Sequence, residues 1–212
     1  MAAWIDVTWA TRSDMAVWPG ESQPVIERVA TVEADGMQVT KVNMGVHVGT
    51  HIDAPRHFIA GGRTIDEMSL EKLYGPCLLI DYKGEGPFIT AKDLESFDWR
   101  DVERVVFRTK NSRIPVSGQF HNEFVSLNLD AAEFLVSQGI KLVGIDYISV
   151  EAFDAEPGFP VHTTLLGAEV VVVEWLRLKE LPPGHAMYEI MALPMLIAGS
   201  DGSPARVLMR RI

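Results

Sequence analysis

Cysteine is nearly absent from this sequence, with one residue in 212. A single thiol cannot form a disulfide within the chain. Cys77 lies in an apolar run at 75–80 that is typical of a buried strand, which argues against a cysteine nucleophile. The sequence therefore predicts a cytoplasmic protein without disulfide stabilisation.

Basic residues are also few, with 19 Lys and Arg against 29 Asp and Glu and a formal net charge of -10. Such a chain repels phosphate backbones and offers no basic stripe, so we expect no nucleic-acid partner. Much of the acidity lies in stretches such as 151–156, which we interpret as solvated surface.

Long apolar runs are missing as well. The longest, at 170–173 and 191–199, fall well short of the roughly 20 residues that a spanning helix needs. The N-terminal residues show no basic region followed by an apolar one. We expect neither a membrane span nor a secretion signal.

What is present is an ordinary globular composition, 47% hydrophobic, without repeats or linkers. We predict a single domain over residues 1–212. Runs rich in β-branched residues predict strands at 4–9, 25–32, 38–46, 77–82, 104–108, 141–145, 170–174, 188–192 and 205–210. Helices are predicted at 69–74, 91–97 and 130–138, the last capped by Asp130 and ended by Gly139. The expected fold class is mixed α/β and strand-rich.

The segment 47–58 carries the clearest chemical signal. In a strand, His47, His51 and Asp53 share one face, and the β-branched neighbours with Pro55 argue against a helix. A straight strand would separate the Cα atoms of the two histidines by roughly 13 Å, near the limit for ligands of one ion. We therefore expect the chain to bend at Gly49.

Two imidazoles and a carboxylate suit Zn, Mn or Fe and leave a coordination position open for water, as in catalytic sites. Four of the six histidines fall in this segment or in a second one. His57, just past the predicted turn, is either a further ligand or a proton-transfer residue, and the spacing leaves both open.

The second segment, 160–175, contains His162 and Glu174. Glu174 ends an apolar strand, where an ionised carboxylate is costly unless it is paired or bound to a cation. Taken alone, this segment also fits a water-facing Glu174 and a His162 that caps a turn at 163–168.

The pattern His-x-Gly-Thr-His-x-Asp-Ala-Pro-x-His-Phe at 47–58 resembles the cyclase family of metal hydrolases, which includes bacterial kynurenine formamidases and isatin hydrolase. Further matching segments lie at 17–20, 144–146, 181–184, 192–194 and 202–206, so the resemblance covers nearly the whole chain. It implies a swivelling β/β/α domain that forms a homodimer or homotetramer.

The resemblance also implies residue roles. His47, His51 and Asp53 would hold one metal, and Asp53 with His162 and Glu174 a second. The ions would be Zn²⁺, one or two per chain, with Mn²⁺ as an alternative. His57 would transfer the proton, and Trp18 would line the substrate pocket; without the resemblance, Trp18 reads as a loop aromatic packed on Pro19.

The implied activity is hydrolysis of a formamide or cyclic amide C–N bond by metal-activated water. The leading substrate is N-formyl-L-kynurenine, an intermediate of tryptophan catabolism, which would yield L-kynurenine and formate. Family formamidases have Thr-Pro-Ser after Gly-Ile-Asp, whereas residues 147–149 here are Tyr-Ile-Ser, so lactam or lactone hydrolysis, as by isatin hydrolase, is the alternative. A non-haem iron oxygenase and a metal-stabilised binding protein without catalysis are the rival classes.

Overall fold

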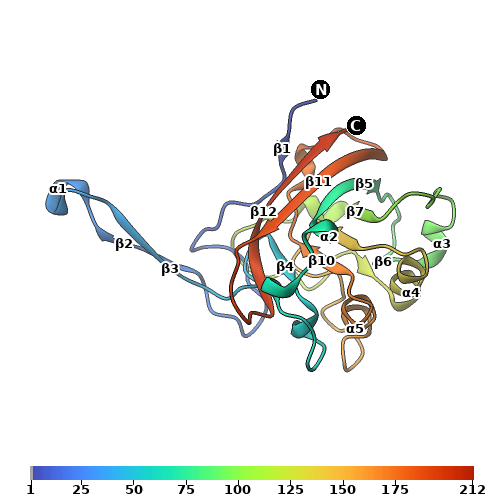
Figure 1. The fold of residues 1–212 in the computed structure, drawn as a ribbon, viewed down its shortest axis with the longest axis horizontal. Coiled ribbons are helices and arrows are strands. Elements are labelled where there is room, and N and C mark those ends of the chain that lie inside the picture. Colours follow the sequence, from blue (N-terminus) through green and yellow to red (C-terminus); the bar gives the residue numbers. More distant parts are fainter. Residues whose placement is uncertain (1) are drawn as a thin grey trace.

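The fold is built on one large sheet in a computed structural model that describes residues 2–212. Within these residues the sheet has eight strands in the order β1-β12-β11-β5-β7-β9-β10-β4 (Figure 1). Because β12 also pairs with β4, seven strands close into a barrel-like sheet, and β1 lies outside on β12. The strands are β1 (Ile5–Asp6), β4 (His51–Asp53), β5 (Tyr74–Asp81), β7 (Arg104–Arg108), β9 (Leu142–Ile145), β10 (Val171–Glu174), β11 (Ala186–Pro194) and β12 (Gly202–Arg211).

The middle of the sheet is parallel and buried on both faces. Strands β5, β7, β9 and β10 pair in parallel, which explains why their sequences are nearly continuous apolar runs. Alternate residues serve two cores: Val105 and Val143 pack toward the helices, whereas Val106 and Leu142 pack into the other core. This arrangement confirms the strand-rich, mixed α/β prediction.

The helices that cover the sheet include α3 (Ala91–Leu94), α4 (Leu129–Ser137) and α5 (Pro160–Gly167), with α4 in contact with both of the others. The predicted cap of α4 is wrong: the side chain of Asn128 accepts from the N–H of Ala131. Asp130 instead accepts from the N–H of Ala91 and so links α4 to α3. Gly139, at φ +75, follows the helix as expected.

Helix α5 is absent from the predictions, which have only a turn at 163–168. Pro160 occupies its first turn, where a missing N–H costs nothing. Smaller elements complete the body: α2 (Leu70–Leu73), β6 (Phe88–Ile89) paired with β8 (Ser126–Leu127), and the 3₁₀ turns η1 (Pro55–His57), η2 (Ile65–Glu67), η3 (Lys110–Arg113) and η4 (Leu178–Glu180). No helix among the described residues is both long and apolar enough to cross a membrane.

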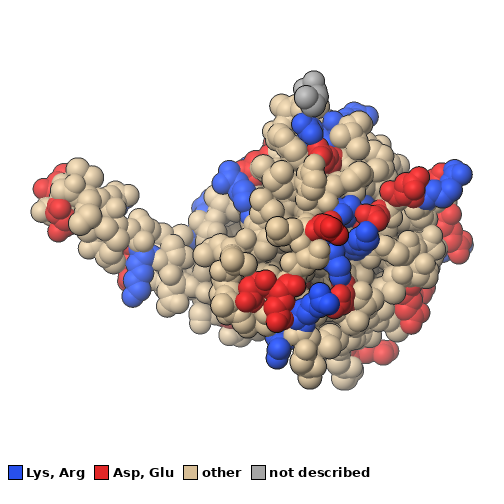
Figure 2. Space-filling view, viewed as in Figure 1, with Lys and Arg blue, Asp and Glu red and all other residues tan. Residues whose placement is uncertain are grey.

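An arm extends away from the body. It consists of the antiparallel pair β2 (Val25–Ala30) and β3 (Val39–Asn43), with α1 (Val32–Asp35) at its tip (Figure 1). Figure 2 shows it standing clear of the rest of the molecule. A lone two-stranded hairpin is at best marginally stable in water. Its exposed apolar side chains are Val25, Ile26, Val29, Val32, Met37, Val39 and Val42.

The carboxyl ends of the parallel strands place buried polar groups at one edge of the sheet. Asp81 ends β5, Arg108 ends β7, Asp146 follows β9 and Glu174 ends β10, and all four side chains are buried. Ligand sites form at the carboxyl ends of parallel strands both in open sheets and in closed barrels. The fold thus brings Glu174 to the position where a site is expected.

Candidate metal centre

The bend predicted at Gly49 is confirmed. Gly49 has φ +74, so the chain turns between His47 and strand β4, and His51 and Asp53 stand on β4. A side chain at Gly49 would be strained by that φ. Strand β4 pairs with β10 so that His51 lies opposite Glu174, which places the two sequence segments side by side.

The centre of the site is a buried group of three side chains. The Nε2 atom of His51 lies 3.3 Å from Asp53 Oδ1 and 3.3 Å from Glu174 Oε2. The opposite ring nitrogen, Nδ1, lies 2.7 Å from the carbonyl oxygen of Gly49, which can only accept, so Nδ1 carries the hydrogen. His51 therefore presents the lone pair of Nε2 to the carboxylates whenever Nε2 is deprotonated.

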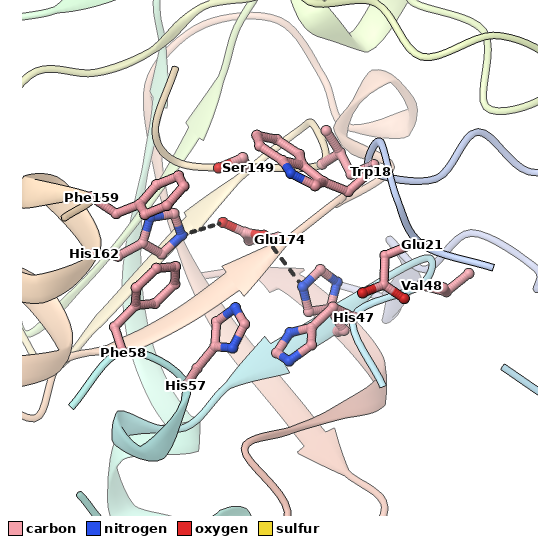
Figure 3. Close-up of a pocket in the computed structure, with 12 residues that line it drawn as sticks. Trp18, Glu21, His47, Val48, His57, Phe58, Ser149, Phe159, His162 and Glu174 are labelled. Carbon is pink, nitrogen blue, oxygen red and sulfur yellow. Dashed lines mark ion pairs between the residues drawn. The ribbon is translucent and has the colours of Figure 1, made fainter. Parts of the chain in front are cut away.

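His162 reaches the site from helix α5. Its Nε2 atom lies 3.4 Å from Glu174 Oε1 (Figure 3). The same atom lies 3.9 Å from Asp53 Oδ2, and the Nδ1 atom lies 2.6 Å from Glu151 Oε2. The His162 side chain thus points into the group of His51, Asp53 and Glu174.

Glu151 corrects the interpretation of residues 151–156 as solvated. Its side chain is 2% exposed and accepts hydrogen bonds from the backbone N–H groups of Val161 and His162, at the start of α5. The sequence signal for Glu151 was weak. It follows the mostly apolar stretch 147–150, but its burial depends on α5, from whose first N–H groups it accepts hydrogen bonds.

His47 and His57 form the open side of the site. Their rings stack with centroids 3.9 Å apart, and His47 Nδ1 lies 2.8 Å from Asp53 Oδ1. Asp201, which the sequence did not suggest, approaches both rings: its Oδ2 atom lies 2.9 Å from His47 Nε2 and 3.2 Å from His57 Nδ1. The structure therefore brings together every residue predicted for the site and adds Glu151 and Asp201.

The protonation of the site is set by its buried carboxylates. Burial alone would lower the pKa of His51 and of His162, but their carboxylate partners outweigh it and raise each pKa to about 10. Asp53 and Glu174 have lowered pKa values despite their burial, because the imidazoles stabilise their charge. The negative charge of these carboxylates is therefore balanced by protons that a bound cation can replace.

One buried atom argues directly for a cation. Asp53 Oδ2 is buried and has no hydrogen-bond partner among residues 2–212, which is costly for a carboxylate oxygen. Donor atoms of His51, Asp53 and Glu174 lie within 4.8 Å of one another, as do those of His47, Asp53 and His57. These overlapping groups share Asp53 and differ from the division inferred from the sequence. Their N and O donors fit a divalent metal.

A cavity of about 180 Å³ opens above these donors. Its walls include the aromatic rings of Trp18, Phe58 and Phe159, which agrees with the place expected for Trp18 (Figure 3). Glu21 also lines the cavity, and among the described lining residues there is no Lys or Arg. An apolar pocket that ends on convergent polar groups is the usual form of an enzyme active site.

Fold and site thus define a metal-dependent enzyme of mixed α/β architecture with a closed, barrel-like sheet. The Cyclase family model matches residues 5–152, well over half of the chain, and this protein belongs to that family.

Similar proteins support this assignment. A kynurenine formamidase of Bacillus anthracis is 33% identical over 99% of this chain and 98% of its own. A solved structure described as a potential metal-dependent hydrolase with cyclase activity has 36% identity and a TM-score of 0.84, covering 100% of this chain and 99% of the other. Isatin hydrolase A from Ralstonia solanacearum, at 24% identity and a TM-score of 0.78 over 98% and 91% of the two chains, shares the fold. The swivelling cyclase-like fold inferred from the resemblance is confirmed.

Proposed function

We propose that this protein hydrolyses N-formyl-L-kynurenine to L-kynurenine and formate. It is a metal-dependent hydrolase acting on a non-peptide C–N bond, as its relatives over the full length of the chain are named kynurenine formamidases. The observation that carries the proposal is the unpartnered Asp53 Oδ2 among imidazole and carboxylate donors at the base of an aromatic pocket.

The proposed ligands are His47, His51, Asp53, His162 and Glu174, holding one or two ions. Nitrogen and carboxylate donors together favour Zn²⁺, with Mn²⁺ as the alternative. Such an ion, when bound, supplies a Lewis acid that acidifies water and polarises the substrate carbonyl.

The chain's own contribution to bond cleavage is proton transfer. Hydrolysis adds the oxygen of water to the formyl carbon and breaks its bond to nitrogen, which must gain a proton to leave. We assign this transfer to His57, which lines the pocket. Burial lowers the pKa of His57 below its usual value, so the ring releases its proton readily.

The pocket suits the two ends of this substrate. Trp18, Phe58 and Phe159 can enclose an aryl ring, while the carboxylate of Glu21 can accept a hydrogen bond from the α-ammonium group. Exclusion of water by these rings would strengthen the polar interactions within.

A cyclic amide is the second candidate, for a specific reason. Residues 147 and 148 depart from the Thr-Pro of the formamidases, whereas Ser149 matches, and one of the departing residues, Ile148, lines the pocket. The sequence difference from the formamidases therefore lies in the part of the pocket wall that would contact the substrate.

The test is hydrolysis by the metal-loaded protein. We expect release of kynurenine from N-formyl-L-kynurenine, with metal content measured by elemental analysis on the same sample. Turnover of isatin without release of kynurenine would move the assignment to the cyclic amides, and inactivity on both compounds would refute the proposal.

We also propose that the arm binds a second copy of this chain, giving a homodimer or a larger assembly of such pairs. The exposed apolar side chains of β2 and β3 need cover that the described part of their own chain does not provide. Light scattering should show that the wild-type protein is a dimer or tetramer. The Val29→Asp variant should contain a larger fraction of monomer. A monomeric wild type would refute this.

We assign the protein to the cytoplasm, since its one thiol, Cys77, is buried and burial raises its pKa, so it is poorly suited to redox chemistry. We regard residues 1–212 as one domain, and a single cooperative unfolding transition would support this.

A further inference from the structure

We propose that Asp201 is a positioning residue that holds His57 in the orientation and tautomer needed for proton transfer. This inference rests on the proposed function, because it assigns Asp201 a part in the same reaction.

The position of the carboxylate favours one tautomer. Asp201 Oδ2 lies 3.2 Å from His57 Nδ1, an ion-pair distance. Because a carboxylate oxygen can only accept a hydrogen bond, its approach favours the tautomer of His57 with the hydrogen on Nδ1. In the neutral ring, Nε2 then has the free lone pair and can accept a proton. The ring itself lines the cavity. A catalytic imidazole oriented by a third group is a recurring arrangement.

The backbone around Asp201 is tied to the segment that carries His57. The carbonyl oxygen of Asp201 accepts from the N–H of Ala54, and the carbonyl oxygen of Ser200 accepts from the N–H of Ile65. Gly202 pairs with Asp53 where β12 meets β4. The carboxylate of Asp201 is therefore held in register with η1, which ends at His57.

The same carboxylate keeps the two stacked rings together. Asp201 Oδ2 also lies 2.9 Å from His47 Nε2. The close approach needs glycine at position 202, since a Cβ there would lie 2.5 Å from Cε1 of His47. One oxygen thus sets the positions of both imidazoles, whose centroids are 3.9 Å apart.

Asp201 differs from the proposed ligands in its surroundings. Its side chain is 44% exposed, whereas that of Asp53 is 1% exposed. Among the described donors, Asp201 belongs to neither of the two groups that could hold a metal. Exposed ion pairs add little to stability, so its loss should leave the fold intact.

The experiment compares Asp201→Ala with Asp201→Asn, which keeps one acceptor oxygen. Because Asp201 also contacts the proposed ligand His47, the variants are assayed at saturating metal. Under this condition we expect kcat of Asp201→Ala to fall by about 10- to 100-fold at unchanged KM, with Asp201→Asn in between. The matched control is Asp66→Asn: Asp66 accepts from the N–H of Gly199 in the same loop, and this variant should keep the wild-type kcat.

A double-mutant cycle tests whether Asp201 affects catalysis through His57. In a His57→Ala background, Asp201→Ala should cost no further activity, because the group it positions is gone. An undiminished loss of activity in that background, at saturating metal, would overturn the proposal.

A second readout does not depend on turnover. In protein labelled with ¹⁵N-histidine, NMR should show Nδ1-protonated His57 in the wild type and loss of this preference in Asp201→Ala. An unchanged tautomer would refute the positioning role even in an active enzyme. Inactivity of the wild type toward formamides, with the expected tautomer change, would instead refute the function alone.

Discussion

Glu151 and His162 form a buried pair in which one carboxylate performs two tasks. Its Oε2 atom lies 2.6 Å from Nδ1 of His162, and its two oxygens accept from the first N–H groups of α5. The imidazole is thereby fixed with its hydrogen on Nδ1, and Nε2 faces Glu174 and Asp53. Outer carboxylates of this kind orient histidine ligands in many metal sites.

Replacing Glu151 should therefore weaken metal binding without removing a ligand. For Glu151→Gln we expect metal affinity to fall by about 10- to 100-fold. Loss of the charge at the helix start should cost about 1 kcal/mol of stability. Titration with Zn²⁺ in the presence of a competing chelator measures the first effect, and urea denaturation of the metal-free protein the second. Wild-type affinity would show that His162 does not bind the metal.

His51 and His57 should separate binding from catalysis. His51→Ala should lose bound metal and activity together, because His51 contacts both central carboxylates. His57→Ala should keep most of its metal and lose about 10²- to 10⁴-fold in rate, the usual contribution of a proton-transfer residue. Elemental analysis and initial rates on the same samples distinguish loss of metal from loss of catalytic rate. An unchanged rate in His57→Ala would remove His57 from the mechanism.

Glu21 offers a test of substrate recognition. Glu21→Gln should raise KM for N-formyl-L-kynurenine by up to about fivefold, since an exposed ion pair contributes at most about 1 kcal/mol. N-formylaniline, which lacks the ammonium group, serves as the control and should show the same KM with both proteins. An equal rise for both compounds would mean that Glu21 shapes the pocket and does not recognise charge.

Asp81 and Arg108, which are outside the proposed metal ligands, should make stability depend on pH. Burial would raise the pKa of Asp81, but the hydrogen bonds from Arg108, Lys83 and Gly184 outweigh it and lower the pKa below the usual 3.8. A lowered folded-state pKa gives stability that is complete above the unfolded pKa and is lost as the pH falls below about 4.

Asp81→Asn should therefore cost about 3 kcal/mol of unfolding free energy at pH 7, since Arg108 would lose its buried partner. The difference in unfolding free energy between the variant and the wild type should become smaller below pH 4. Urea denaturation at pH 7, 5 and 3 measures this, and a gap that stays constant with pH would contradict the assignment.

The sequence predicted the strands, the bend and the donors His47, His51 and Asp53 because each depends on local pattern. The ligand roles of the two donors in the second segment came from the family resemblance. The β-branched runs marked the sheet, and Gly49 marked the bend between His47 and His51. Asp201 was not predicted as a site residue because only the pairing of β12 with β4 brings it to His57. These two residues are more than a hundred positions apart in the sequence. Glu151 was not predicted as a site residue because its burial depends on α5, which packs over it. The sequence of α5 itself has no strong helical pattern.

The arm begins and ends beside the pocket. Glu21 lies just before β2 and His47 just after β3, so both roots of the hairpin contribute residues to the pocket wall. Binding of a second chain to the arm would therefore act on segments joined directly to that wall. If the arms hold a dimer and its formation orders these segments, turnover per chain would decline on dilution.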